Sequence, residues 1–528
     1  GTGVLNGQNV TLEDSEGVTE SRAFYQMQNG EKSKIGTVEY GEFVSTKKGD
    51  ESGLFVTSGL HSILIDQDRA LDVATTQNNE DLSFTLLLKG EGAVNLSAKN
   101  GNAPLQFGNS SNEYQGGTTL VDGKVQLIVE DGFSKGALRL EEAAELDLNG
   151  QNQTVSQLRN ASHKGIELNG GTLTVNDDGN VLGVIQLGDN EKSTLKLTGN
   201  NKVDKANSFS GIGSIVIGAI ADQTLNKTAE LTLSATNENL NGIFKVENGT
   251  LALQDSAGLG GLGNSSVKLA DQGVLDLTFT NRGDAQFNNS VESTEKGQFN
   301  VNLAGGKFSL GDKFTAQVGS AFQGSLQLTN TVFTLNQDQA QHLGSGSLIL
   351  SSDSNTTLAE ESEIGSLLFD GGALSFGDNE SLTLTVNSLG AKRGGTINVA
   401  DSEKISAQTT GSIIDMSNTA FTHDLIISKT DVNESLLDKF TVNVNGQNIQ
   451  DTPSQIHNLK NSGSDLAVAK GTYNYNLSEK NNDKNGLFIG YELSDIELLE
   501  ASKGNNALVI SNEDSIHNNL NATITGKG

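Results

Sequence analysis

The sequence predicts an all-β solenoid, a fold in which short strands stack coil upon coil. Three observations point to it: one line of sequence recurs three times, paired apolar triplets follow each copy, and 528 residues contain 62 Gly but only 2 Pro. Each coil of a solenoid buries its apolar face against the next one. The core then grows in one dimension, which suits a chain too long for a single globular core.

The recurring line occupies residues 114–127, 240–253 and 322–335. Each copy opens with a bulky residue, one spacer and Gly, and continues with three apolar residues at fixed spacing. The first copy has Tyr114 and Gly116, followed by Leu120, Val125 and Leu127. The second has Leu240 and Gly242, followed by Val246, Leu251 and Leu253. The third has Phe322 and Gly324, followed by Leu328, Phe333 and Leu335. Gly123 and Gly249 mark a turn inside the first two copies, and Thr331 stands there in the third. This pattern predicts two short strands joined by a turn.

Apolar-polar-apolar triplets follow each copy in pairs, at 138–148, 267–277 and 348–358. Such alternation is typical of a strand that buries one face. The stretch EEAAELDL at 141–148 has the highest helix propensity in the chain. Its alignment with the other two copies nevertheless predicts a turn and a strand.

Composition excludes several classes of protein. Pro is rare, as expected of strands that must donate ladder hydrogen bonds, and Asn-Gly pairs such as Asn149-Gly150 supply tight turns. Cys is absent, so no disulfide staples the fold, and no apolar run approaches 18 residues. No signal peptide is visible at Gly1. The net charge of −30 disfavours nucleic acid as a partner.

The chain divides into four predicted parts. Residues 1–110 are expected to form N-terminal coils, 111–419 the repeat-bearing coils, 420–492 an insertion with a hairpin, and 493–528 further coils. The hairpin is predicted from the clean alternation in GTYNYNLSEKNNDKNGLFIGYEL, residues 471–493. At about 20–25 residues per coil, the chain would hold about 21–26 coils.

The last forty residues echo an early stretch. Leu493, Ile496 and Leu498 repeat the spacing of Leu60, Ile63 and Ile65; Ala507–Ile510 repeats Ala70–Val73; Ile524 and Gly526 repeat Leu88 and Gly90. The early stretch leads directly into the Tyr114 repeat. We therefore expect the natural protein to continue past Gly528 with another repeat.

The repeat unit resembles the passenger-associated repeat of autotransporters. The stretch 468–498, with Ala469-Lys-Gly-Thr-Tyr473 and Gly490-Tyr491, is similar to a segment of adhesin-type passengers of the self-associating and diffuse-adherence kind. The resemblance implies a right-handed parallel β-helix, secreted through a C-terminal β-barrel translocator that these residues do not contain. It also implies display on the outer membrane of a Gram-negative cell, with roles in adhesion, aggregation, biofilm formation and virulence.

Two groups of residues are candidates for contacts with partners. Four lysines lie in a stretch of near-neutral charge, and three glutamates form an acidic counterpart. Together they predict a patch for self-association on neighbouring cells or for an anionic ligand. The patch consists of Lys192, Lys196, Lys202, Lys205, Glu141, Glu142 and Glu145. Arg282-Gly283-Asp284 is a three-residue motif through which a turn can present both charges to an integrin. A host glycan or matrix protein is the alternative partner.

The sequence predicts binding and not catalysis. Solenoids also carry polysaccharide lyases and hydrolases, which need clustered carboxylates and basic residues, often with aromatic platforms. Aromatic residues make up 5% of this chain and Trp is absent, and the acidic residues are scattered among turns. No His spacing suggests zinc and no Asp-rich loop suggests calcium, so neither a metal nor a cofactor is expected.

Overall fold

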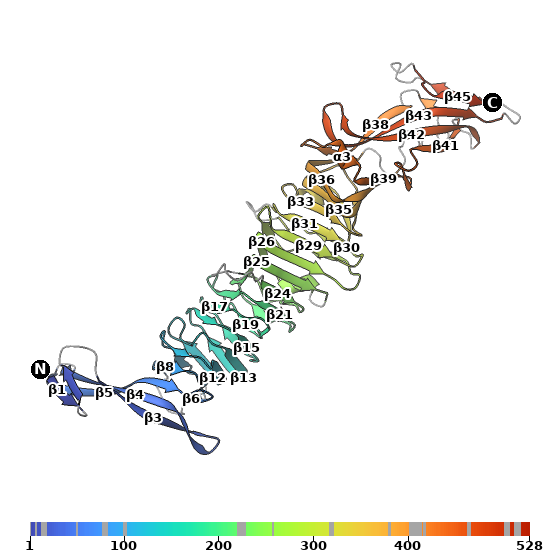
Figure 1. Ribbon diagram of the computed structural model, residues 1–528. Helices are drawn as coiled ribbons and strands as arrows, with labels where there is room; N and C mark the ends of the chain where they lie inside the picture. The colour runs from blue at the N-terminus through green and yellow to red at the C-terminus, as the bar shows by residue number, and fades with distance from the viewer. Residues whose placement is uncertain are drawn as a thin grey trace. The chain divides into compact units, whose positions relative to one another are not determined.

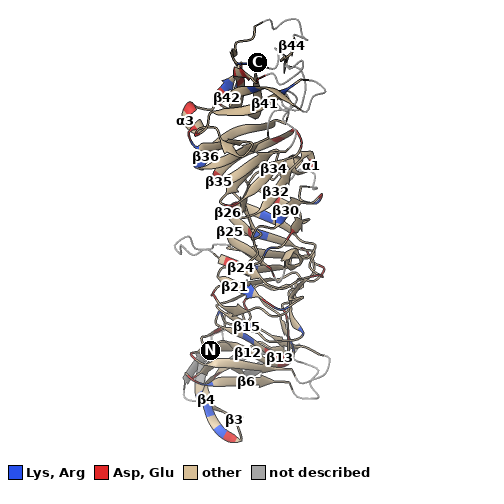
Figure 2. Ribbon diagram, turned by 90° about the vertical axis from the view of Figure 1, so that its right-hand side faces the viewer, with Lys and Arg blue, Asp and Glu red and all other residues tan. Residues whose placement is uncertain are grey.

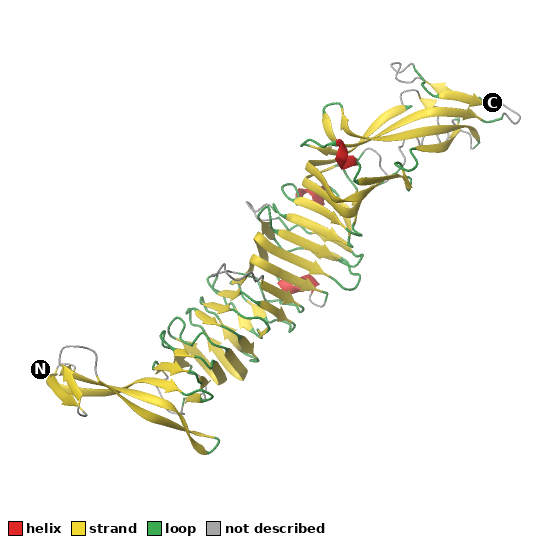
Figure 3. Cartoon of the chain, viewed as in Figure 1, coloured by secondary structure: helices red, strands yellow, loops and turns green. Residues whose placement is uncertain are grey.

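The computed structural model is nearly all β, with 60% of residues in strands and 3% in helices, and it contains a parallel β-solenoid of about 13 turns (Figures 1 and 3). This confirms the predicted fold class. The structure describes residues 2–5, 8–11, 18–48, 51–75, 83–98, 103–218, 229–255, 258–315, 322–377, 382–400, 414–415, 419–461, 466–500, 507–511 and 519–528.

The chain forms two compact units, Gly1–Val274 and Leu275–Gly528, which are described separately. The first unit contains β1 (Thr2–Leu5), β2 (Gln8–Thr11), β3 (Val18–Gln28), β4 (Glu31–Lys48), β5 (Glu51–Ile65), β6 (Ala70–Ala74), β7 (Ser83–Phe84), β8 (Leu87–Gly90), β9 (Ala93–Ser97), β10 (Leu105–Phe107), β11 (Glu113–Tyr114), β12 (Thr118–Leu127), β13 (Leu138–Asp147), β14 (Gln153–Val155), β15 (Leu158–Asn160), β16 (Gly165–Glu167), β17 (Thr172–Val175), β18 (Asn180–Val181), β19 (Ile185–Gln186), β20 (Thr194–Leu197), β21 (Asn200–Val203), β22 (Phe209–Ser210), β23 (Ser214–Ile217), β24 (Ala229–Leu233), β25 (Ile243–Gln254) and the short helix η1 (Gly258–Leu262). Strand β26 (Ser266–Thr278) contains the division.

Within the described part of the first unit, the coil strands stack in three parallel columns. Column A runs through β6, β9, the start of β12, the start of β13, β15, β18, β21, β24 and the end of β25. Column B runs through β7, β10, the ends of β12 and β13, β16, β19 and β22. Column C runs through β14, β17, β20, β23 and the start of β25.

Apolar side chains of equivalent strand positions form ladders inside the coils. In column C, Leu173 pairs with Leu195, Leu195 with Ile215, and Ile215 with Phe244, and all four are buried. Burying one such side chain contributes about 1.5–3 kcal/mol. The ladders therefore hold successive coils in register, because a slip of one residue would turn every apolar side chain outward.

The repeated line forms strands in each copy, but the predicted pair of strands joined by a turn is seen only in the third, as β31 and β32; in the first two copies β12 and β25 run through Gly123 and Gly249 without a break. Its three opening residues, Tyr114, Leu240 and Phe322, are each 1% exposed, and all nine apolar residues that follow them are buried. A Cβ on Gly116 would lie 2.6 Å from the carbonyl carbon of Gly92, so only Gly lets the coil cross this closely over the preceding one. In the third copy Asn330, with φ of 44°, provides the turn just before Thr331.

The N-terminal region differs from the prediction. Residues 1–110 were expected to be coils throughout, but β3, β4 and β5 pair antiparallel as a long meander. Parallel coil pairing begins with β5 and β8 in one sheet and with β6 and β9 in the next. Alternation of apolar and polar residues predicts a strand but not whether it pairs parallel or antiparallel with its neighbour. The sequence pattern therefore could not distinguish an antiparallel meander from parallel coils.

The second unit contains β27 (Ala285–Phe287), β28 (Val291–Ser293), β29 (Gln298–Asn302), β30 (Lys307–Leu310), β31 (Ser325–Thr329), β32 (Val332–Leu335), α1 (Gln337–Gln341), β33 (Ser347–Ser351), β34 (Asn355–Leu358), β35 (Ser362–Phe376), β36 (Leu384–Val399), β37 (Ile414–Asp415), β38 (Ala420–Ser428), α3 (Glu434–Leu437), β39 (Phe440–Val444), β40 (Gln447–Asn448), β41 (Ser454–Lys460), β42 (Ala467–Asn481), β43 (Lys484–Leu498), β44 (Ile510–Ser511) and β45 (Thr523–Gly526). Its coils stack through β29, β31, β33, β35 and β36, and through β27, β30, β32, β34, β35, β36 and β39.

The predicted hairpin is present near the C-terminal end. Strands β42 and β43 pair antiparallel from Ala469 opposite Leu498 to Asn481 opposite Lys484, and β38 and β41 pair antiparallel with their outer edges. The predicted further coils at 493–528 are not seen as a stack in the described residues; β45 pairs parallel with the end of β43 instead. These two antiparallel regions explain why the solenoid has about 13 turns and not the 21–26 expected from dividing the whole chain.

Candidate interaction surface

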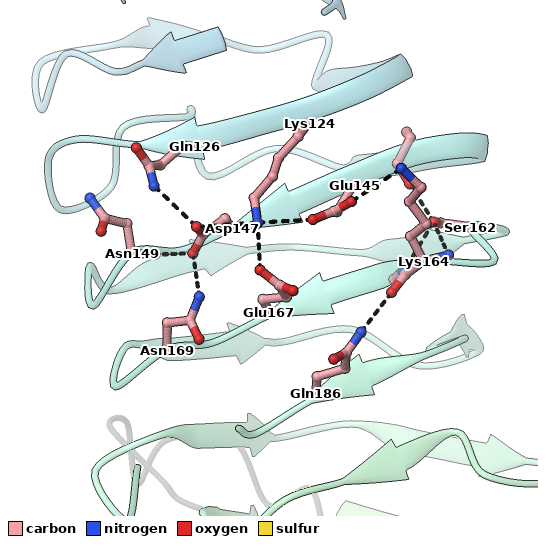
Figure 4. Close-up of polar contacts among 12 residues, drawn as sticks. Lys124, Gln126, Glu145, Asp147, Asn149, Ser162, Lys164, Glu167, Asn169 and Gln186 are labelled. Carbon is pink, nitrogen blue, oxygen red and sulfur yellow. Dashed lines mark hydrogen bonds and ion pairs between the residues drawn. The ribbon is translucent and has the colours of Figure 1, made fainter. Parts of the chain in front are cut away.

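Charged residues are distributed over many strands and not gathered on one element (Figure 2). One cluster of charges in the first unit surrounds Lys124, whose ammonium lies 2.9 Å from Glu145, 3.6 Å from Asp147 and 2.7 Å from Glu167 (Figure 4). Three successive strands of column B, β12, β13 and β16, bring these residues together. The cluster ties three coils to one another on the outer face of the column.

Hydrogen bonds and charge keep Lys124 and Asp147 ionised. Burial would lower the pKa of Lys124, but its hydrogen bonds to Glu167 and Glu145 and the charges of Glu167 and Asp147 outweigh burial and raise that pKa above its ordinary value. Burial would raise the pKa of Asp147, yet the amide groups of Asn169 and Gln126 and the main-chain N–H of Asn149 donate to it and hold its pKa low. The arrangement is a satisfied structural network.

The acidic half of the predicted patch is largely engaged within the chain. Glu145 binds both Lys124 and Lys164, and its side chain is 15% exposed. Glu141 accepts a hydrogen bond from Arg139 Nε at 2.7 Å. Glu142 is exposed. Of the three predicted carboxylates, Glu142 is thus the one most available to a partner.

The basic half of the predicted patch lies on two columns. Lys196 lies on β20 in column C and Lys202 on β21 in column A, while Lys192 and Lys205 lie in the adjoining loops. Lys192, Lys202 and Lys205 are exposed and Lys196 is partly exposed. Within the part of the chain that the structure describes, none of the four forms an ion pair. Their charges are therefore available to a partner, but on two columns and not on one.

The Arg282-Gly283-Asp284 motif occupies a turn just before β27 in the second unit. Arg282 and Asp284 are both exposed, as integrin recognition would require. Asp284 also has a structural role, because its Oδ1 accepts the main-chain N–H of Lys307 at 2.8 Å. The turn therefore presents the motif from a fixed position on the coil.

Two cavities lie on either side of helix α1. The first, about 390 Å³, is lined by Asp284, Gln286, Lys307, Phe308 and Gln339 among others. The second, about 580 Å³, is lined by Gln337, Glu361, Glu363, Thr383, Thr385, Asp424 and Lys484 among others. Both volumes fall in the range of small-molecule sites, and both linings are rich in amide, hydroxyl and charged groups.

Ion pairs fix the charged rim of the second cavity. Lys484 Nζ lies 2.5 Å from Asp424 Oδ2, and Lys429 pairs with Glu363. Burial would raise the pKa of Asp424, but the hydrogen bonds from Lys484 and Asn481 hold it below its usual range. The neighbouring His423 is buried, which lowers its pKa, and its Nε2 lies 3.1 Å from the carbonyl oxygen of Leu382.

The sequence did not reveal these cavities, because they are assembled from strands of several coils. The one local signal was Asn336, which caps α1 by accepting the N–H of Gln339 at 2.9 Å. A polar residue before the run Gln337–Gln341 is an N-cap signature. The side chain of Gln339 then pairs with both main-chain groups of Leu310, which positions the helix between the two cavities.

The described residues contain neither a membrane-spanning helix nor a cluster of metal ligands. None of their helices is long and apolar enough to cross a membrane. In the same residues, no three His, Asp or Glu side chains come together in a way that could hold a metal ion.

Comparison with known proteins finds two uncharacterized relatives from Escherichia coli K12. The chain is 28% identical over 328 residues to the uncharacterized protein YuaQ, an alignment that covers 57% of this chain and 22% of YuaQ. It is 34% identical over 131 residues to the uncharacterized lipoprotein YdeK, which covers 24% of this chain and 10% of YdeK. The matched region thus spans less than a quarter of either relative.

No family model matches the chain, and no solved structure matches it. The comparisons therefore establish a weak relationship to long E. coli proteins, and the solenoid is consistent with a passenger domain or a surface adhesin.

Proposed function

We propose that this chain is part of a non-enzymatic adhesin, an autotransporter-type passenger displayed at the bacterial cell surface. The β-solenoid and the passenger-type repeats support this function. The similarity to a protein named as a lipoprotein supports a place in the cell envelope. The barrel translocator that the resemblance implies is part of the same proposal.

Within this role, the chain associates with copies of itself on neighbouring cells, which would drive aggregation and biofilm formation. The observation that carries this step is the set of four lysines at 192, 196, 202 and 205. Their charges have no ion-pair partner among the described residues, in a protein whose net charge is −30. Carboxylates of a second copy, with Glu142 as one of them, would supply partners at short range. Salt screens charges beyond about 8 Å, so the overall repulsion is weakened while close pairs persist.

Analytical ultracentrifugation at low and high salt tests this step. We expect a dimer that dissociates as salt rises. Replacing all four lysines by Gln should weaken the dimer about 10- to 100-fold, because each exposed pair contributes about 0.2–1 kcal/mol and 1.4 kcal/mol is tenfold. A matched control replaces Lys313, Lys392, Lys470 and Lys480, which are also exposed, and changes the net charge equally. If both variants lose affinity equally, general charge and not this patch governs association.

A second function, binding of a host glycan or matrix protein, is favoured by the polar lining of the second cavity beside α1. Hydroxyl and amide groups such as those of Thr383, Thr385 and Gln337 are suited to hydrogen bonding with sugars. A protein that stays monomeric at every concentration but binds immobilised glycans would support it. In that case a variant that fills the second cavity, such as Thr385→Phe, should lose binding, whereas Lys202→Gln should not.

A further inference from the structure

The two antiparallel regions of the chain are copies of one module. Residues 18–92 contain β3, β4, β5 and β8, and residues 454–528 contain β41, β42, β43 and β45. In each, three antiparallel strands are followed by one parallel strand on the third.

The register of the strands is the same in both copies. Tyr40 lies opposite Leu60 and Val38 opposite Ile63; likewise Tyr473 lies opposite Leu493 and Gly471 opposite Ile496. The ladder is irregular at the same place, just before Tyr40 and just before Tyr473. The N–H of Asp66 donates to Ile35 at 2.9 Å, and the equivalent N–H of Leu499 donates to Val468 at 3.0 Å.

The final strand shows the same correspondence in detail. Ile65 pairs with Gly90, and Leu498 pairs with Gly526. Gly90 has a φ of 102° and Gly526 has a φ of 110°. A Cβ on Gly90 would lie 2.2 Å from the main-chain oxygen of Ile65, and a Cβ on Gly526 would lie 2.1 Å from the main-chain oxygen of Leu498. Both positions thus require Gly for the same steric reason. The echo between Ala70–Val73 and Ala507–Ile510 is not reproduced in the structure, because β6 pairs with β9 whereas β44 pairs with β37.

In the first copy, the outer edge of the final strand carries the first repeat coil. Tyr114 pairs with Gly90, the N–H of Gln115 donates to Gly90 at 2.9 Å, and the N–H of Gly116 donates to Gly92 at 3.0 Å. The side chain of Asn112 accepts the N–H of Leu88 at 2.8 Å. Leu88 is completely buried. The module is therefore the template on which the aromatic-x-Gly coil is laid.

In the second copy, the equivalent edge is open among the described residues. No described strand pairs with β45 on the side away from β43, and Ile524, the counterpart of the buried Leu88, is 51% exposed. We propose that residues 454–528 are a second template, and that the edge of β45 binds a coil that begins with an aromatic residue, one spacer and Gly. The coil would place its aromatic residue opposite Gly526 and its Gly over Gly528. This proposal does not depend on the adhesin function.

A fusion tests the template directly. Residues 93–160 of this chain, which contain the Tyr114 repeat and its next coils, are appended after Gly528 of the full chain. Gly528 corresponds to Gly92, so the appended coil would meet β45 in the native register. Hydrogen exchange of residues 519–528 should slow by about tenfold or more relative to the unmodified chain, because the Ile524 amide gains a partner and leaves solvent.

The matched control carries Gly116→Val in the appended copy alone, which should block the crossing over Gly528 and leave exchange as fast as in the unmodified chain. Equal exchange rates in the fusion and its control would overturn the proposal.

A chimera tests the template role of the second module with the native coils in place of appended ones. In the full chain, residues 18–92 are replaced by residues 454–528, so that the native coils from Ala93 onward meet the second module. We expect residues 110–120 to keep their slow exchange, and Gly526→Val in the replacement to make that exchange at least about tenfold faster. Exchange in this chimera as fast as in a variant lacking residues 18–92 would contradict the template role.

Discussion

The ammonium group of Lys124 lies 2.7 Å from a carboxylate oxygen of Glu167, although Glu167 belongs to the second coil further along the chain. Glu145 and Asp147, on the coil between them, complete the contact. One side chain thus bridges three coils by charge, outside the apolar ladders. This relationship makes the cluster a sensitive reporter of coil stacking.

Replacing Lys124 by Met should destabilise the coils around β12, β13 and β16 by about 1–2 kcal/mol. Three carboxylates would then lack their shared cation, and the loss is smaller than for a fully buried pair because Lys124 is 32% exposed. Native-state hydrogen exchange of these strands measures the effect. Lys135→Met is the control, since Lys135 is 71% exposed and its pair with Asp131 should matter by less than about 0.5 kcal/mol.

The same cluster should make the first unit sensitive to acid. The folded state lowers the pKa of Asp147, so this carboxylate stabilises the fold above its ordinary pKa of about 4, and the contribution is lost as pH falls through the folded-state value. Asp147→Asn should therefore be less stable than the native chain at pH 7 but lose less stability between about pH 4 and pH 2. Parallel acid profiles for both proteins would refute this assignment.

Tyr114 should ionise only in strong alkali. Burial raises its pKa to about 12, and its hydroxyl oxygen lies 2.6 Å from Thr118 Oγ1. Ultraviolet titration of the native chain should show a component that titrates near pH 12 and is missing in Tyr114→Phe. Tyr114→Phe should cost about 1 kcal/mol, because the buried Thr118 hydroxyl loses its partner, whereas Tyr114→Ala should cost about 3–5 kcal/mol through the cavity it leaves.

Asp284→Glu tests the integrin motif. The longer side chain moves the carboxylate, so a loop that binds an integrin through Asp284 should lose host-cell adhesion by about tenfold or more. Arg282→Lys, which keeps the charge next to the same turn, serves as a milder comparison. Unchanged adhesion with Asp284→Glu would remove integrin binding from the possible functions.

The repeat pattern predicted the coils well because burial in a stack is a local, periodic requirement. Leu120, Val125 and Leu127 are buried as their spacing indicated, and all but the last residue of EEAAELDL lie in strand β13 despite the helix propensity of that stretch. Stacking against the neighbouring coils outweighs that propensity, which differs between residues by less than about 1 kcal/mol.

The surface was predicted less well. Glu145 was expected to face a partner, yet it is held by Lys124 and Lys164, which come from the coils before and after it. Lys196 and Lys202 are six residues apart but lie on different columns. The surface prediction counted charges within short stretches of sequence. The ion-pair partners of Glu145 lie on neighbouring coils, about 20 residues away in sequence, so that count did not include them.

The sequence by itself determined which residues form strands, which side chains face the core, and the equivalence of Leu60–Ile65 with Leu493–Leu498. The physical reason is that apolar alternation and turn glycines act within one coil. Tertiary structure alone decided the direction of strand pairing, the columns on which each charge lies and the cavities beside α1. Those features depend on contacts between coils. There, hydrogen bonding and charge decide which strands and side chains pair, and the local sequence pattern does not distinguish between these pairings.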